Sequence, residues 1–309
     1  MGCLARSEAT KQSRCPEEAR VLNIVVTLIA APGEAALSAI VAALPAQLDW
    51  LAPETACDLY FEGLDATATE TLARQVIGDA PIDLLVQPAG ARRKRLLAAD
   101  LESTIIENEM LDELAEFIGK RAEVSEITRR AMNGELDFEQ ALAARVALLK
   151  GLPASVLDEA AARIRLMPGA RELVATMRAS GARTLLVSGG FSVFAEPIAA
   201  QLGFDCVVCN RLDIAHGKIA GTVAPPIVTR ETKRDALVAL ANESSIALAD
   251  TAAIGDGAND LPMLHAAGLG IAFHAKPAVA AAARCRLDHA DLTGVLYAQG
   301  YRREEIVAG

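Results

Sequence analysis

The chain has 309 residues, enough for one large domain or two modest ones. Hydrophobic residues make up 52% and aromatic residues only 4%, so the chain can bury a large core that is mainly aliphatic. The formal net charge of −10 argues against nucleic acid or an anionic membrane as the main partner.

The N-terminal segment "MGCLARSEATKQSRCPEEAR" lacks the apolar centre of a signal peptide. No apolar run of the sequence approaches the ~20 residues that a membrane helix needs. We therefore expect residues 1–18 to form a disordered tail of a cytoplasmic protein that has no membrane partner.

Residues 19–90 alternate between strand and helix patterns, as in a small α+β module. "VLNIVVTLIAA" predicts a strand that Pro32 and Gly33 end, and a helical stretch follows over 34–44. "ACDLYFEGL" predicts a second strand, and residues 66–77 predict a helix that Gly78 ends. "PIDLLVQP" predicts the last strand, and no catalytic cluster is recognisable in this module.

Residues 91–309 predict a doubly wound parallel sheet, an α/β fold. Short apolar runs recur between helical patterns, and each is followed by polar or glycine-rich residues: "LLAAD", "RTLLVSGG", "FDCVVCN", "TAAIGDGAND" and "LGIAF". In such sheets the chemistry gathers beyond the carboxyl ends of the strands. Asp100, Ser188 and Asp256 each follow or end such a run.

One block, about residues 107–165, carries only helix signals. Asp137 can cap a helix that runs through "FEQALAARVALLKG". A helical insertion directly after the first strand is typical of a lid over the site.

"DLEST" places Asp100 and Glu102 at the exit of the first strand. Two carboxylates two residues apart on an extended segment face the same side. They can hold a cation, or one can attack an electrophile while the other moves a proton. Taken alone, the pattern fits a solvated turn equally well.

Three further motifs follow in order. "VSGG", with Ser188 and Gly189, offers a hydroxyl and backbone N–H groups to a phosphate, or is a plain tight turn. Lys233 can neutralise a phosphate or lie at the surface. "GDGAND", with Asp256, Asn259 and Asp260, suits a hard cation such as Mg²⁺ with oxygen ligands.

The order D-x-[DE]-x-T, S-G-G, Lys, G-D-G-x-N-D resembles the haloacid dehalogenase-type phosphatases, and among them the phosphoserine phosphatases. The resemblance runs from Leu96 to about Asp291 and continues through "ENEMLDELA" and "MNGELDFEQALAARVALLKGLP". It implies a sheet of the haloacid dehalogenase type with a helical cap. The module before it resembles the small ACT-like regulatory domain of many bacterial members.

The resemblance also implies roles in the reaction. Asp100 would be the nucleophile that takes the phosphoryl group, and Glu102 the general acid and base. Asp100, Asp256 and the backbone carbonyl of Glu102 would hold Mg²⁺, with Asp260 as a ligand or as support for one. The phosphoryl oxygens would be bound by Ser188, Gly189, Lys233 and Asn259.

In the cap, Glu109 would meet an ammonium group and Arg145 a carboxylate, with Met132 and Phe138 closing the pocket. From the residues alone, Glu109 also fits a surface acid and Met132 and Phe138 fit core positions. Arg145 alone fits better as an arginine that covers an apolar face. Cation, anion and phosphate together describe a phosphorylated amino acid. The resemblance implies that it is O-phospho-L-serine, hydrolysed to serine as the last step of serine biosynthesis. A homodimer is compatible with this interpretation.

Glu102 departs from the family pattern, which usually has Asp there. Glu keeps the carboxyl group but adds one methylene. Two enzymatic alternatives stay open: a phosphotransferase from phosphoserine to homoserine, and a phosphatase of another small phosphorylated metabolite. A non-enzymatic alternative is an amino-acid-sensing module with a degenerate phosphatase fold.

Overall fold

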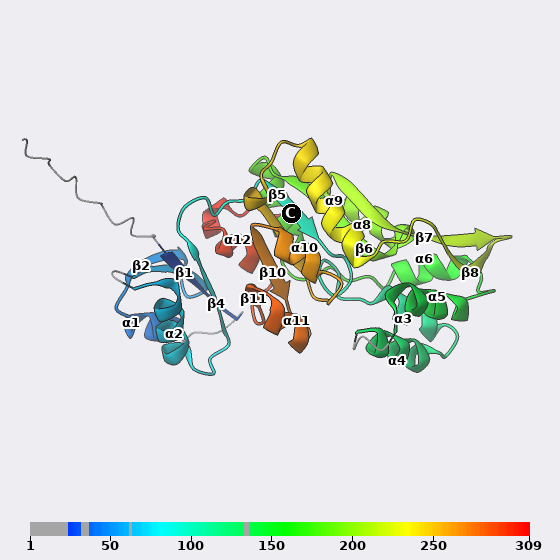
Figure 1. Cartoon of the computed structure of the whole chain (residues 1–309), viewed down its shortest axis with the longest axis horizontal. Helices are drawn as coiled ribbons and strands as arrows, with labels where there is room; N and C mark the ends of the chain where they lie inside the picture. Colours follow the sequence, from blue (N-terminus) through cyan, green and yellow to red (C-terminus); the bar gives the residue numbers. More distant parts are fainter. Residues whose placement is uncertain (1–23, 32–36, 62–63, 133–135) are drawn as a thin grey trace, which may run out of the picture.

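The computed structural model describes residues 24–31, 37–61, 64–132 and 136–309. Two sheets organise this part of the chain, and both are visible in Figure 1. None of its helices combines the length and the apolar character needed to cross a lipid bilayer.

The N-terminal sheet has four antiparallel strands in the order β2-β3-β1-β4. With its two helices it follows the β-α-β-β-α-β succession of the ferredoxin-like motif, which is compatible with the expected ACT-like module. The elements are β1 (Ile24–Ala30), α1 (Leu37–Ala42), β2 (Gln47–Ala52), β3 (Ala56–Tyr60), α2 (Ala66–Ile77) and β4 (Ile82–Pro88).

Helix α2 begins and ends where its sequence predicts. The side chain of Asp65 accepts the N–H of Ala68 and so caps the first turn. Gly78 follows the last residue with φ +57°, a conformation that favours glycine. The apolar face of α2, with Ala73 and Ile77, packs on the sheet beside α1.

The second sheet has seven strands in the order β11-β10-β9-β5-β6-β7-β8. All neighbours are parallel except β7 and β8, which form an antiparallel hairpin. The strands are β5 (Leu96–Ala99), β6 (Arg183–Phe191), β7 (Cys206–Ala215), β8 (Lys218–Ala224), β9 (Thr251–Gly255), β10 (Leu269–Phe273) and β11 (Cys285–Leu287).

Helices cover both faces of this sheet, as predicted. Alternate residues of β5 point to opposite faces, so Leu97 packs in one core and Leu96 in the other. One face is covered by α7 (Ala170–Ala179), α8 (Ser192–Leu202) and α12 (Gly294–Ala298). The other is covered by α9 (Arg230–Glu243), α10 (Leu261–Ala266) and α11 (Pro277–Ala282). Leu248–Asp250 and Arg303–Glu305 form short 3₁₀ turns.

The insertion between β5 and α7 is helical and lies beside the β7–β8 hairpin (Figure 1). It contains α3 (Met110–Glu116), α4 (Arg121–Met132), α5 (Phe138–Leu148) and α6 (Ser155–Ala161). Asp137 caps α5 by accepting the N–H groups of Glu139 and Gln140. We refer to α3–α6 as the cap.

A buried polar cluster joins the two sheets. Arg92, between β4 and β5, pairs with the carboxylate of Asp58 on β3 and donates to Thr27 on β1 at 2.8 Å. It also donates to the carbonyls of Tyr297 and Ala298 at 3.2 Å. The expected division at residue 90 stays a prediction, because the two sheets share this cluster and part of one apolar core.

Candidate active site

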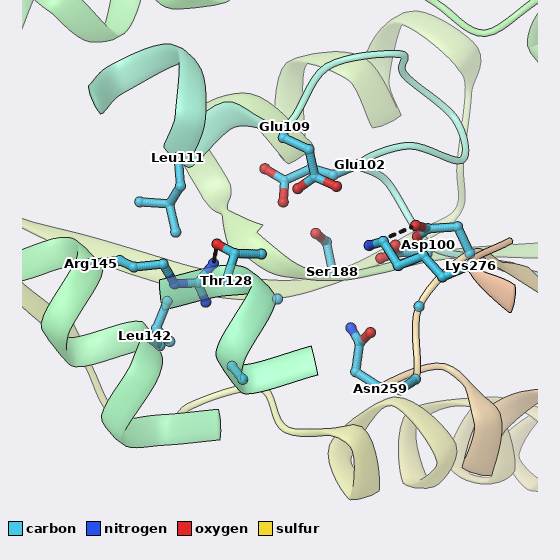
Figure 2. Close-up of a pocket in the computed structure, with 15 residues that line it drawn as sticks. Asp100, Glu102, Glu109, Leu111, Thr128, Leu142, Arg145, Ser188, Asn259 and Lys276 are labelled. Carbon is cyan, nitrogen blue, oxygen red and sulfur yellow. Dashed lines mark hydrogen bonds and ion pairs between the residues drawn. The ribbon is translucent and has the colours of Figure 1, made fainter. Parts of the chain in front are cut away.

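Four neighbouring strands, β10, β9, β5 and β6, end at one edge of the parallel sheet. Asp100 follows β5, Asp256 follows β9, and Ser188 lies near the end of β6. All three line one cavity of about 140 Å³, which Figure 2 shows from close by. The topology therefore brings together side chains that are far apart in the sequence.

The loop after Asp100 is tightly coiled around one carbonyl. Leu101, which is fully buried, accepts the N–H groups of Ile105 at 2.8 Å and Ile106 at 2.9 Å. Ser103 takes a positive φ of 55° to complete the turn. This loop holds Glu102 beside Asp100 in the cavity wall.

Lys233 forms buried ion pairs with two aspartates, Asp100 and Asp260. Its ammonium group lies 2.6 Å from an oxygen of Asp100 and 2.7 Å from an oxygen of Asp260. Only 1% of its surface is exposed, and it comes from the first turns of α9. Burial alone would lower the pKa of Lys233, but the two carboxylates outweigh it and raise that pKa.

Three carboxylates gather around this lysine. One oxygen from each of Asp100, Asp256 and Asp260 lies within 4.8 Å of the others, and all three residues are buried. Asp260 also accepts the N–H of Gly257 at 3.0 Å. A Cβ on Gly255 would stand 2.5 Å from the carboxyl carbon of Asp260, so only glycine lets that carboxylate approach the strand.

The two lysines beside the carboxylate cluster do not fully offset the effect of burial on Asp100 and Asp256. Burial, together with the neighbouring acids, raises the pKa of Asp100 well above its ordinary value, and Lys233 only partly offsets this. Burial raises the pKa of Asp256 to about 6, against the opposing effect of Lys276 at 3.3 Å. A further cation beside these oxygens would restore their ionised forms.

Glu102 is half-buried and its carboxyl group is held in place. One of its oxygens accepts the N–H of Met110 at 3.1 Å. A Cβ on Gly190 would lie 3.0 Å from the same oxygen, so glycine makes room for the longer acid. Removal from water, with repulsion from Glu109, raises the pKa of Glu102 to about 8.

The end of β6 is fixed by a buried amide. Asn210 on β7 donates to the carbonyl of Gly189 at 2.7 Å and accepts the N–H of Val228 at 2.8 Å. The hydroxyl of Ser188 accepts the N–H of Gly190 at 2.9 Å. These bonds keep the Ser188 hydroxyl at the cavity wall.

The cap supplies the opposite wall. Glu109 precedes α3 and accepts the hydroxyl of Ser103 at 2.8 Å. Arg145 lies in the last turn of α5 and lines the same cavity. Figure 2 shows Arg145 and Asp100 at opposite ends of the cavity. The Glu109 carboxylate and the Arg145 guanidinium thus line the same cavity as Asp100, which is paired with Lys233.

The cavity lining contains most of the predicted site residues: Asp100, Glu102, Glu109, Arg145, Ser188, Gly189, Asp256 and Asn259. Lys233 and Asp260 lie behind it and reach it through Asp100. Met132 and Phe138 end α4 and begin α5, but their side chains lie outside the described part of the structure.

Two lining residues with polar side chains were not predicted. Lys276 follows β10 and pairs with Asp256, and Thr128 on α4 accepts a hydrogen bond from Arg145. Both also line an outer cavity of about 580 Å³ between α4 and α11. Lys276 could have been singled out by its position after the strand "LGIAF"; nothing in the sequence marks Thr128.

A family comparison agrees with this fold and site. The family described as haloacid dehalogenase-like hydrolase matches residues 97–265, more than half of the chain. The chain belongs to the haloacid dehalogenase-like hydrolases.

Among curated proteins, the chain is similar to enzymes named phosphoserine phosphatase. It is 43% identical to the one from Streptomyces coelicolor over 83% of this chain and 63% of the relative. It is 45% identical to the one from Lactococcus lactis subsp. lactis, over 66% of this chain and 94% of the relative. The chain spans 58–63% of the length of the Streptomyces, Mycobacterium tuberculosis and Vibrio cholerae relatives.

Solved structures show the same relationship. A haloacid dehalogenase family hydrolase from Salmonella enterica serovar Typhi aligns over 89% of this chain and 97% of its own, with 28% identity and a TM-score of 0.78. A structure described as a phospho-aspartyl intermediate analogue of phosphoserine phosphatase aligns over 66% of this chain and 98% of its own. Its identity is 40% and its TM-score 0.63.

Proposed function

We propose that this chain is a Mg²⁺-dependent phosphoserine phosphatase that hydrolyses O-phospho-L-serine to serine and phosphate. One observation carries the proposal: a single cavity has Asp100, which is paired with a buried lysine, at one end and the oppositely charged Glu109 and Arg145 in the cap. Phosphate, ammonium and carboxylate are the three charged groups of phosphoserine. The names of the relatives point to the same substrate.

Asp100 would attack the phosphorus atom and form an aspartyl phosphate, while the serine oxygen leaves. This divides the hydrolysis into two displacements on the same phosphorus atom. Lys233 holds the Asp100 carboxylate at 2.6 Å and offsets the repulsion between that carboxylate and the phosphate dianion. The phosphoenzyme analogue described for one related structure supports this route.

The residues present fit a divalent cation. Asp100, Asp256 and Asp260 provide hard oxygen atoms within 4.8 Å of one another. Burial raises the pKa values of Asp100 and Asp256, so a bound cation would favour their ionised forms. We assign Asp100, Asp256 and the backbone carbonyl of Glu102 as ligands, with Asp260 as a ligand or as support for one. When bound, Mg²⁺ would neutralise the phosphoryl oxygens and stabilise charge that develops on them.

Ser188, Gly189, Lys233 and Asn259 would bind the phosphoryl oxygens. Ser188, Gly189 and Asn259 line the cavity, and Asn210 fixes the Gly189 carbonyl and so the direction of that turn. The Ser188 hydroxyl and the Lys233 ammonium group are held before the substrate arrives, so they lose little freedom on binding.

Glu102 would manage the protons. The serine alkoxide is a poor leaving group unless it is protonated, and the water that attacks the aspartyl phosphate must lose a proton. With a pKa of about 8, Glu102 is mainly protonated at neutral pH and can donate in the first step. After donation, its carboxylate can accept the proton from water in the second step.

Glu109 would bind the ammonium group and Arg145 the carboxylate of the substrate. Arg145 belongs to the cap and Glu109 directly precedes its first helix, so substrate contact and cap position are coupled. An arginine can bind a carboxylate with two parallel hydrogen bonds. The roles of Met132 and Phe138 in closing the pocket stay predictions.

The longer acid at residue 102 favours one second candidate, a phosphotransferase that passes the phosphoryl group to homoserine. The additional methylene of Glu moves the proton-transfer atom by about a bond length relative to Asp. This shift changes which acceptor fits. Measuring the partition of the phosphoenzyme between water and homoserine distinguishes the two. Serine binding without any metal-dependent turnover would instead favour a sensing module.

The nucleophile is tested by rapid quench with ³²P-labelled phosphoserine. We expect label on Asp100 in the wild type and no turnover in Asp100→Asn, because an amide cannot replace this nucleophile. Asp235→Asn, an exposed position on α9, is the matched control and should turn over normally. Label on another residue, or an active Asp100→Asn protein, contradicts the assignment.

A further inference from the structure

Arg145 is oriented by a contact between two cap helices. Its Nη1 donates to the hydroxyl of Thr128 on α4 at 3.0 Å, and its Nε donates to the carbonyl of Ala141 on its own helix at 3.1 Å. Figure 2 shows this contact at the cavity wall. Among the described residues, no carboxylate forms an ion pair with Arg145.

The polarity of the Thr128 hydroxyl is fixed by its own helix. It donates its proton to the carbonyl of Val124, one turn earlier, at 3.0 Å. Its lone pairs are therefore left to accept from the guanidinium, which has N–H donors only. The branched Cβ restricts the rotamer of Thr128, so the acceptor stays in one place.

The guanidinium needs such support because it is half-buried and removed from water. Burial lowers its pKa, against the opposing effect of Glu102, Glu109 and Asp112. A long side chain with several free torsions would otherwise lose much freedom when it binds a ligand. Two N–H groups are fixed in this way, and the others stay available to a ligand in the cavity that Arg145 lines.

We propose that Thr128 is a positioning residue that sets the specificity for a substrate carboxylate by holding Arg145 in its binding orientation. This inference rests on the proposed function for the identity of the substrate. It adds that recognition of the carboxylate depends on the packing of α4 against α5 and not on Arg145 alone.

The test compares phosphoserine with phosphoethanolamine, which differs only by lacking the carboxylate. Thr128→Val keeps the branched shape but removes the acceptor. We expect it to raise KM for phosphoserine about tenfold, the lower end of what a hydrogen bond to a charged group contributes, and to leave kcat and phosphoethanolamine turnover nearly unchanged. Thr128→Ser keeps the hydroxyl and should restore the wild-type KM.

The control variant is Thr71→Val on α2. Thr71 makes the same hydroxyl bond to a carbonyl one turn earlier, at 2.8 Å to Thr67, but lies on the N-terminal module. It should change neither KM. If Thr128→Val does not fold, Thr128→Ala carries the same expectation. Equal losses on both substrates, or no loss on either, overturn the proposal.

A substrate-free readout separates this inference from the proposed function. NMR of the arginine side chains reports rotation of the Arg145 guanidinium, with its signal assigned by its loss in Arg145→Lys. Thr128→Val should speed that rotation and Thr128→Ser should not; unchanged rotation overturns the inference. A wild type inactive on phosphoserine contradicts the proposed function, and the NMR result then decides the role of Thr128.

Discussion

Replacing Glu102 with Gln isolates the proton-transfer role of this residue. Gln keeps the size of the side chain and an oxygen that can accept the N–H of Met110, which lies 3.1 Å away in the wild type. The backbone carbonyl at residue 102 is also unchanged. The variant therefore loses the exchangeable carboxyl proton and little else.

The expected loss follows from the chemistry of the leaving group. General acid–base catalysis contributes about 10²–10⁴ in rate, so kcat for phosphoserine should fall by that factor, or ~3–5 kcal/mol in activation free energy. An aryl phosphate has a leaving group that needs no protonation. Its first step should survive in Glu102→Gln, and the phosphoenzyme should accumulate because water activation is lost.

The pH profile gives a second readout of the same residue. Because burial and Glu109 raise the pKa of Glu102 to about 8, its acid form is present below that pH and is lost as the pH rises through it. We expect kcat/KM for phosphoserine to fall above about pH 8 in the wild type. Glu102→Gln should lack this descending limb.

Stopped-flow and steady-state assays of phosphate release, with Glu107→Gln as the control, measure these effects. Glu107 belongs to the same loop but its side chain is 44% exposed. If Glu102→Gln hydrolyses phosphoserine at the wild-type rate, the acid–base role belongs to another group and the reasoning is refuted.

Three further predictions concern the substrate, the metal and the junction between the sheets. Arg145→Ala should lower kcat/KM for phosphoserine by ten- to a hundredfold, about 1.5–3 kcal/mol, while phosphoethanolamine turnover changes little. Arg165→Ala, an exposed position after α6, should spare both substrates, and equal losses in Arg145→Ala would indicate a folding role for Arg145. Asp256→Asn should weaken Mg²⁺ binding, measured by calorimetry, by at least about tenfold; unchanged affinity would exclude Asp256 as a ligand. Asp58→Asn leaves the buried Arg92 without its carboxylate and should cost about 3–5 kcal/mol in unfolding free energy, with kcat unchanged. The control Asp49→Asn should cost less than about 1 kcal/mol in unfolding free energy, because the partner Arg302 is half-exposed. Equal costs for Asp49→Asn and Asp58→Asn would argue against a special role for the buried cluster.

Local sequence signals predicted the elements that have clear boundaries. The helix over 66–77 and the role of Asp137 as the N-cap residue of α5 are confirmed. These signals are local, because a capping acid, a glycine or a periodic apolar face acts within a few residues. The strand ends were found because buried parallel strands read as short apolar runs that stop at polar residues.

Strands without such a signal were missed. β2 (Gln47–Ala52) is a partly exposed edge strand with no clean alternation, and β11 (Cys285–Leu287) has only three residues. The β7–β8 hairpin was not recognised as a pair. His216 and Gly217 at its turn both take positive φ, as in two-residue hairpin turns, and the glycine is the sequence signal for such a turn.

Asp100 and Lys233 were singled out by the order of their motifs along the chain and the family resemblance that this order carries, because each taken alone also fits a surface position. Contacts between residues that are far apart in the sequence could not be predicted. Thr128 matters only because α4 packs beside α5, and Asn210 because β7 lies next to β6. The contact of Arg92 with Asp58 depends on how one sheet meets the other.

The most direct test of the account is phosphate release from a panel of O-phospho-L-serine, O-phospho-L-threonine and common sugar phosphates, each with Mg²⁺ and after chelation. We predict that phosphoserine is hydrolysed fastest and that chelation abolishes turnover while added Mg²⁺ restores it. Preference for a substrate without both an ammonium and a carboxylate group, or activity that survives thorough chelation, would contradict the proposed function.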